Sequence, residues 1–147
     1  GDSFAALLAA HGLTLDLAAL TWFARWLPAH AHMRIFDTRF YLARWPLGAV
    51  EPQVDDTENV RFLWASAEQV LADCDAGHAK IIFPTRRNLE RLAQCADYAQ
   101  AVAHAHAQPP RTITPFTEDR NGAPHLCIPD GLGYPVTSEK LSGALRG

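Results

Sequence analysis

The clearest pattern of hydrophobic and polar positions along the chain covers residues 35–44. Phe, Thr, Phe and Leu at positions 36, 38, 40 and 42 alternate there with Asp, Arg, Tyr and Ala at positions 37, 39, 41 and 43. Side chains of an extended chain point to opposite faces in turn, so this alternation predicts a strand with one buried and one mixed face. An apolar stretch over residues 20–27, which ends at Pro28, predicts a second strand just before it.

Three further segments have helical patterns. Residues 4–11 are apolar and rich in alanine, with Asp2 or Ser3 as a possible N-cap and Gly12 at the carboxyl end. Ser66 followed by Gln69 is a capping-box pattern and predicts a helix up to residue 75. Residues 85–107 predict one long helix between Pro84 and the prolines at 109 and 110. Its apolar stripe consists of Leu89, Leu92, Ala96, Ala99, Val102 and Ala103.

The remaining segments add short strands and turns. Residues 59–64 predict a short strand, and residues 111–118 and 123–129 predict a hairpin around Asn121 and Gly122. Residues 131–135 are rich in turn formers, and residues 138–147 predict a frayed, flexible tail. About five strands with two or three helices indicate a mixed α/β domain.

Composition restricts the classes of function. The 147 residues are 48% hydrophobic and 20% charged, with a net charge of −3, which is typical of a globular domain. This charge argues against electrostatic binding to nucleic acid or to an anionic membrane, and the chain lacks a run of about 18 apolar residues. Cys74, Cys95 and Cys127 are widely spaced, so we expect free thiols in a reducing cytoplasm.

The first residue is also informative. The chain begins with Gly1, and its single methionine is Met33. We therefore expect a processed, engineered or cut end, with further residues upstream. Removal of an initiator methionine in front of Gly1 is the alternative.

Arg34, Asp37 and Arg39 form the first candidate site. The planar guanidinium of arginine donates two parallel hydrogen bonds and therefore suits phosphate, so we interpret these three residues as substrate-binding. The competing interpretation is that the charged side chains pair with their neighbours on a strand face.

The second candidate is an acidic loop. Asp55, Asp56 and Glu58 offer the oxygen ligands that magnesium prefers, and Glu58 is the candidate metal ligand. The alternative is that these carboxylates are solvated. Histidine pairs at positions 30 and 32 and at positions 104 and 106 lack a third ligand at a recognisable spacing, so we interpret them as exposed histidines.

Three stretches, in order, resemble one branch of the Nudix hydrolases, the branch that includes coenzyme A diphosphatases. The first is the string TWFARWLPAHAHMRIFDTRFYLA at residues 21–43, and the third is residues 115–135. In the second, residues 51–71, an acidic loop leads into a strand that ends in tryptophan and then into a helix. Its matching positions are Glu58, Trp64, Ser66, Glu68 and Leu71. We expect Trp64 to pack this helix onto the sheet.

The resemblance implies a Nudix-like α/β/α sandwich around a mixed sheet, incomplete at its N-terminal side. Residues 1–137 would form the C-terminal part of such a domain, and residues 138–147 the tail. It further implies hydrolysis of a diphosphate linked to another group, assisted by Mg²⁺ or Mn²⁺. The glutamate-rich signature that holds the metal in this family has no counterpart in these residues, so no catalytic residue is assigned and we expect the signature upstream of Gly1.

Two functions remain open at this stage. The chain is either part of an enzyme that hydrolyses a nucleoside or coenzyme A diphosphate, or a non-catalytic binding or assembly module derived from the same fold. In both cases we expect an uncovered sheet edge and apolar face. We therefore expect a homodimer, or pairing with a missing N-terminal segment.

Overall fold

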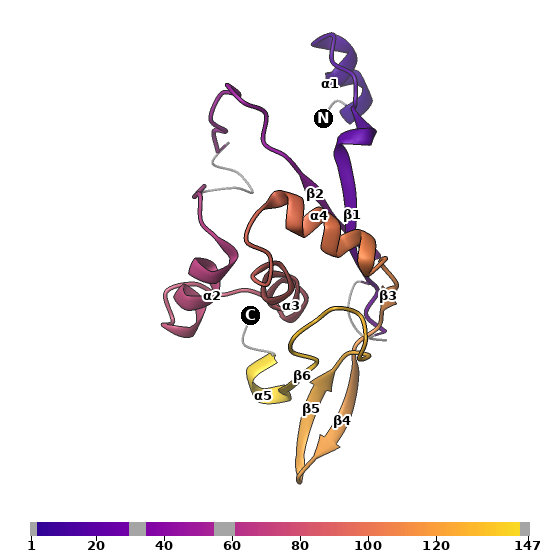
Figure 1. Cartoon of the computed structure of the whole chain (residues 1–147), viewed down its shortest axis with the longest axis vertical. Coiled ribbons are helices and arrows are strands. Elements are labelled where there is room, and N and C mark those ends of the chain that lie inside the picture. The colour runs from indigo at the N-terminus through magenta and orange to yellow at the C-terminus, as the bar shows by residue number, and fades with distance from the viewer. Residues whose placement is uncertain (1–2, 30–34, 55–60, 145–147) are drawn as a thin grey trace.

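The computed structural model describes residues 3–29, 35–54 and 61–144, which combine helices with two small sheets (Figure 1). The strand order is β2-β1-β3 in the first sheet and β4-β5-β6 in the second. The mixed α/β class predicted from the sequence is confirmed.

The first sheet contains the two strands that the alternating pattern predicted. β1 (Leu20–Trp26) pairs antiparallel with β2 (Thr38–Ala43), and the register shifts between Trp22 and Ala24. On its other side, β1 pairs in parallel with the two-residue strand β3 (Thr112–Ile113). β1 is therefore the central strand, and it carries most of the buried side chains of this sheet.

The second sheet is a hairpin extended by one strand. β4 (Phe116–Arg120) and β5 (Ala123–Cys127) meet at Asn121 and Gly122, whose φ angles are 56° and 75°. Two successive positive φ angles are the requirement of a tight hairpin turn, so the predicted hairpin is confirmed.

The segment after residue 137 has regular structure where we expected a frayed tail. β6 (Ser138–Lys140) pairs antiparallel with β5, and α5 (Leu141–Ala144) follows it. The pairing supplies backbone hydrogen bonds, and Leu141 packs against the core.

Serine side chains cap the amino ends of the first two α-helices. At α1 (Phe4–Ala10), Ser3 Oγ accepts a hydrogen bond from the amide of Ala6 at 3.2 Å. A 3₁₀ turn, η1 (Leu17–Ala19), then leads into β1. At α2 (Ala67–Asp75), Ser66 Oγ accepts from the amide of Gln69 at 3.1 Å. The predicted cap is confirmed, although the Gln69 side chain donates to Asp73 rather than back to the cap.

The single helix predicted over residues 85–107 is wrong. The structure has two helices, α3 (Phe83–Leu92) and α4 (Tyr98–Ala107). Asp97 Oδ1 accepts a hydrogen bond from the amide of Gln100 at 2.8 Å, and Gln100 Oε1 accepts from the amide of Ala96 at 3.1 Å. These side chains satisfy backbone amides that a continuous helix would have bonded internally, so a new helix starts at this point.

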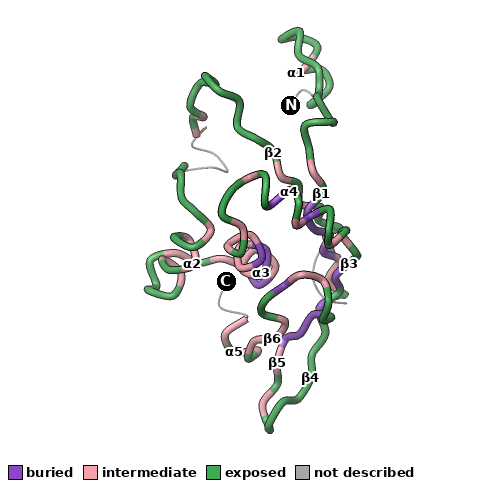
Figure 2. The backbone as a smooth tube through the Cα atoms, viewed as in Figure 1, coloured by how far each residue is buried: buried purple, intermediate pink, exposed green. Residues whose placement is uncertain are grey.

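The core lies where β1, α3, α4 and β5 meet, and the buried part of the chain is confined to this region (Figure 2). Trp26 is 1% exposed and stands at its centre, with the rings of Phe83 and Tyr134 edge-on at 6.1 and 5.9 Å. The buried members of the cluster are Phe23, Ala24, Trp26, Phe83, Ala105, Ile113, Leu126, Ile128 and Tyr134.

Away from this core the chain is open. Its accessible surface is 10646 Å², whereas a compact monomer of 16.2 kDa exposes about 7,500 Å². The helix α1, the segment leading into β1 and the loops after β2 are exposed along most of their length (Figure 2). None of the described helices has the length and apolar character needed to cross a membrane.

The region before α2 differs from the prediction. Of the expected strand 59–64, residues 61–64 are described and are not in a strand, and the earlier residues lie outside the described part. Trp64 is 59% exposed and contacts other aromatic rings, so our expectation that it packs α2 onto the sheet is wrong.

Candidate functional site

The hairpin of β1 and β2 brings together two of the three predicted substrate-binding residues. Arg25 stands directly opposite Arg39 in the strand register, and Asp37 lies beside both. Nε and Nη2 of Arg25 each donate to one carboxylate oxygen of Asp37 at 2.9 Å, and Arg39 Nη2 donates to Asp37 Oδ2 at 3.4 Å. Arg34, the third predicted residue, lies outside the described residues. We call Arg25, Asp37 and Arg39 the hairpin charge cluster.

The cluster is a surface feature with a net positive charge. The hydrogen bond from Arg25 is the main cause that lowers the pKa of Asp37, and the same bond raises the pKa of Arg25. Two donors of the Arg25 guanidinium are bonded to the two oxygens of the Asp37 carboxylate. Within the described residues Arg39 makes one long contact, and its side chain is 50% exposed, so it is the member best able to bind an anion.

The described residues do not provide a site for Mg²⁺ or Mn²⁺. Within residues 3–29, 35–54 and 61–144, no three His, Cys, Asp or Glu side chains converge on a point where a metal ion would fit. The carboxylate oxygens of Asp37 already accept from arginines. Glu58, the predicted ligand, lies outside the described residues, as do Asp55, Asp56, His30 and His32.

Sequence reasoning missed a row of buried polar side chains on α3. Instead of the predicted leucine and alanine stripe, α3 buries Phe83, Arg87, Asn88 and Arg91. The spacing of four between Phe83, Arg87 and Arg91 was a readable signal that they share one face. Their charge led us to expect solvent exposure instead, because arginine is seldom fully buried without partners.

Each of the three guanidinium nitrogens of Arg91 donates a hydrogen bond. Arg91 is 2% exposed, and its Nη1 donates to the carbonyl of Phe23 at 2.8 Å. Nη2 donates to the carbonyl of Gln108 at 3.1 Å, and Nε donates to His104 Nε2 at 3.0 Å. The guanidinium also lies 4.4 Å from the ring centroid of Phe23. Arg91 therefore ties β1, α3 and α4 together, which is a structural role.

Asn88 is the acceptor of two further buried hydrogen bonds. Its Oδ1 accepts hydrogen bonds from Trp26 Nε1 at 3.2 Å and from the hydroxyl of Tyr134 at 2.8 Å. Both donors are buried aromatic side chains that need an acceptor. This pair of hydrogen bonds fixes the orientation of the two central rings.

Arg87 belongs to a charged network between α3 and β6. Its Nη2 donates to Glu90 at 2.8 Å and to Glu139 at 3.2 Å. Arg86 contacts Glu90 at 3.3 Å and Asp75 at 2.6 Å. Burial lowers the pKa of Arg87 and raises the pKa of Glu90, because both charged forms lose hydration. Among the described residues, the buried atoms Arg87 Nε, Arg87 Nη1 and Glu90 Oε2 find no hydrogen-bond partner.

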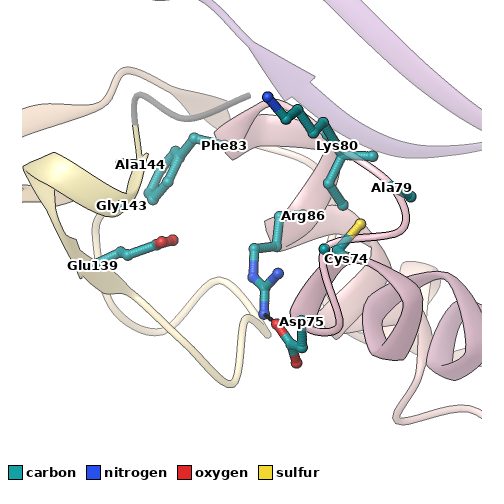
Figure 3. A pocket seen from close by; sticks show the side chains of 11 residues that line it. Cys74, Asp75, Ala79, Lys80, Phe83, Arg86, Glu139, Gly143 and Ala144 are labelled. Carbon is teal, nitrogen blue, oxygen red and sulfur yellow. Dashed lines mark hydrogen bonds and ion pairs between the residues drawn. The ribbon is translucent and has the colours of Figure 1, made fainter.

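A cavity of 450 Å³ opens beside this network, between α2, α3 and α5 (Figure 3). In Figure 3, Arg86 extends to the carboxylate of Asp75, and Glu139 reaches toward the cavity from the side of β6. Lys80 and Cys74 complete the polar part of the lining. Two cations, on Lys80 and Arg86, and two carboxylates, on Asp75 and Glu139, therefore line the same cavity. Their charges balance, so the cavity favours neither an anion nor a cation.

A larger groove of 780 Å³ lies between the end of β2, the start of α2 and the junction of α3 with α4. Its apolar lining includes Leu42, Trp64 and Leu92, and Tyr98 and Cys95 line the junction. Trp64 also meets the rings of Trp45 and Phe62 at centroid distances of 5.2 and 5.1 Å. We call this the aromatic groove.

No known family model matches the chain, and neither a curated protein nor a solved structure gives a significant match. Within the described residues, the hairpin charge cluster carries an exposed arginine, and the aromatic groove offers an apolar surface.

Proposed function

We propose that this chain is part of a Nudix-type hydrolase that cleaves a nucleoside or coenzyme A diphosphate linked to another group. In this proposal β1, β2 and the helices belong to a Nudix-like sandwich with a mixed sheet. The hairpin charge cluster contacts the diphosphate. Carboxylates outside the described residues hold Mg²⁺ or Mn²⁺, with Glu58 as the candidate ligand within this chain.

The position of Arg39 is the observation that carries the proposal. It lies on β2, within the stretch that resembles the Nudix branch, and half of its side chain is open to solvent. Asp37 accepts two hydrogen bonds from Arg25 and one long hydrogen bond from Arg39, so it holds the two arginines side by side, and Arg39 keeps donors that have no partner among the described residues. An exposed guanidinium next to a second fixed cation is a suitable arrangement for one phosphate group.

The alternative function is a non-catalytic assembly module. The observation in its favour is the exposed apolar surface. None of the residues of α1 is buried, and Trp45, Phe62 and Trp64 form a cluster in which each ring is at least 40% exposed. Exposed aromatic clusters of this kind mark surfaces that contact other proteins.

A binding measurement tests the role of the cluster. Isothermal titration of the purified chain with ADP, coenzyme A and inorganic pyrophosphate should show weak binding of all three. Because Arg39 would donate to the phosphate, Arg39→Ala should weaken each interaction about tenfold, a loss typical of one charge-assisted hydrogen bond.

Arg120→Ala is the matched control. Arg120 is also on an exposed strand, pairs with an acid two positions earlier and is 42% exposed at its side chain, but it lies on the second sheet. Equal losses in both variants, or no effect of Arg39→Ala, would exclude a specific phosphate contact.

Hydrolysis is tested separately on the full-length protein. Magnesium-dependent release of phosphate products from coenzyme A derivatives is the expected result. Absence of activity toward coenzyme A derivatives, NADH and sugar nucleotides would favour the assembly module.

A further inference from the structure

The helix α1 lies outside the packed core of the described residues. It has seven residues, and none of them is buried. Isolated helices shorter than about 12 residues are marginal in water, so a helix of this length persists only when one face is packed. In Figure 1, α1 stands at the end of the molecule, beyond the amino end of β1 and away from the core.

The face that α1 offers is apolar and has regular spacing. Phe4, Leu7 and Leu8 occur at positions i, i+3 and i+4, so they lie on one side of the helix. Phe4 is 65% and Leu7 is 47% exposed. The other residues of α1 are alanines, and the helix has no charged side chain whose burial would cost hydration energy.

The aromatic groove offers apolar side chains that could contact this face. Its volume is 780 Å³, and Leu42, Trp64 and Leu92 give it an apolar wall. An amphipathic helix that places residues i, i+3 and i+4 in a hydrophobic groove is a recurrent mode of recognition.

We propose that α1 of one copy of this chain docks in the aromatic groove of a second copy, and that α1 of the second copy docks in the groove of the first. The exposed area supports a dimer. The chain exposes about 3,000 Å² more than a compact monomer of its mass, and an obligate dimer buries about 1,000–2,500 Å² on each subunit. A reciprocal exchange of α1 is also closed by two-fold symmetry, so it stops at the dimer. This inference is independent of the proposed diphosphatase function.

The mass of the purified chain in solution is the first test. Sedimentation velocity between 1 and 100 µM should give a dimer, twice the chain mass of 16.2 kDa. Leu7→Asp and Trp64→Asp, one on each side of the contact, should each raise the dimer dissociation constant at least tenfold. Ile82→Asp is the control: Ile82 is also 59% exposed but precedes α3 at its N-cap, where an aspartate is favourable. Its dissociation constant should be unchanged.

A cross-link then identifies the partner surface. Cys95 lines the aromatic groove, so a cysteine introduced into α1 can report contact with it. A chain with Leu7→Cys and Cys95→Ser is mixed with the unaltered chain and oxidised. A covalent dimer in which residue 7 of one copy is joined to Cys95 of the other is the expected product.

Each of the following results would overturn the proposal. They are a monomer at 100 µM, a dimer that Leu7→Asp leaves intact, and a cross-linked dimer whose disulfide maps to Cys74 or Cys127 instead of Cys95. A single chain with Leu7→Cys that forms its disulfide to Cys95 only within itself would also overturn it. Near-ultraviolet circular dichroism of each variant identifies any that has lost its fold.

Discussion

Arg91 Nε donates a hydrogen bond to His104 Nε2 at 3.0 Å, and this contact joins α3 to α4. Since Nε2 is the acceptor, the imidazole must be neutral with its proton on Nδ1. Burial lowers the pKa of His104, and the charge of Arg91 lowers it further. The contact therefore favours one protonation state and makes the stability of the fold depend on pH.

We expect the free energy of unfolding to fall as the pH drops below about 6.5. In the unfolded chain His104 has its ordinary pKa near 6.5, whereas in the folded chain the pKa is lower. Above that range both states hold a neutral imidazole. Below it the unfolded state binds a proton that the folded state resists, so acid favours unfolding.

Urea unfolding at pH 7.5 and 5.5 measures this dependence. His104→Gln, which keeps an acceptor for Arg91 but does not titrate, should reduce the loss of stability between the two pH values. His106→Gln, on the exposed side of the same helix, should leave it unchanged. An undiminished loss in His104→Gln would contradict the role of this histidine.

Arg91→Lys should destabilise the fold although it preserves the charge. An ammonium group cannot reach the carbonyl of Phe23, the carbonyl of Gln108 and the His104 ring together, so buried acceptors are left unpaired. We expect a loss of about 2–4 kcal/mol in the free energy of unfolding, measured by denaturant titration. Arg111→Lys, at an exposed position, is the comparison; similar values for the two variants would refute the prediction.

Asn88→Ala should cost about 2–3 kcal/mol, because it removes the acceptor that Trp26 and Tyr134 share in the core. The emission of a buried tryptophan reports its surroundings, so the Trp26 contribution should also shift. The double variant with Tyr134→Phe removes one orphaned donor and should recover part of the loss. If the losses of Asn88→Ala and Tyr134→Phe simply add in the double variant, the loss of the shared acceptor does not explain the destabilisation.

Glu90→Ala should lower the free energy of unfolding by about 3 kcal/mol. Glu90 faces Arg87, which is 2% exposed, and its removal leaves a buried cation with Glu139 as the remaining carboxylate at hydrogen-bond distance among the described residues. Thermal unfolding followed by circular dichroism gives the measurement. Glu68→Ala, in the exposed first turn of α2, should change stability by less than about 1 kcal/mol. A cost for Glu90→Ala as small as that would show that Arg87 needs no partner there.

Local patterns predicted the elements whose causes are local. The alternation in residues 35–44 predicted β2, and the capping serine at 66 predicted the start of α2. The Asn121–Gly122 pair predicted the hairpin because two positive φ angles are required at that turn. In each case the decisive residues are within a few positions of the structure they specify.

The break between α3 and α4 was also encoded locally, by Asp97 and Gln100, but it was hidden in a long alanine-rich stretch. The pairing of β6 with β5 was not visible in the same way. It depends on the position of β5, which is fixed elsewhere in the fold. A strand of three residues has little pattern of its own.

By itself the sequence determined the mixed α/β class and the strands β1 and β2, and it offered the pairing of Asp37 and Arg39 with their neighbours as one of two interpretations. The tertiary structure alone decided that Arg25 would be the main partner of Asp37, that Arg87 and Arg91 would be buried, and that no residue of α1 would be buried among the described residues. The physical reason is distance along the chain. Propensity and periodicity act over a few residues, whereas the hydrogen bonds of buried Arg91 go to a histidine and two carbonyls that lie 13–68 positions away and meet it only in the folded state.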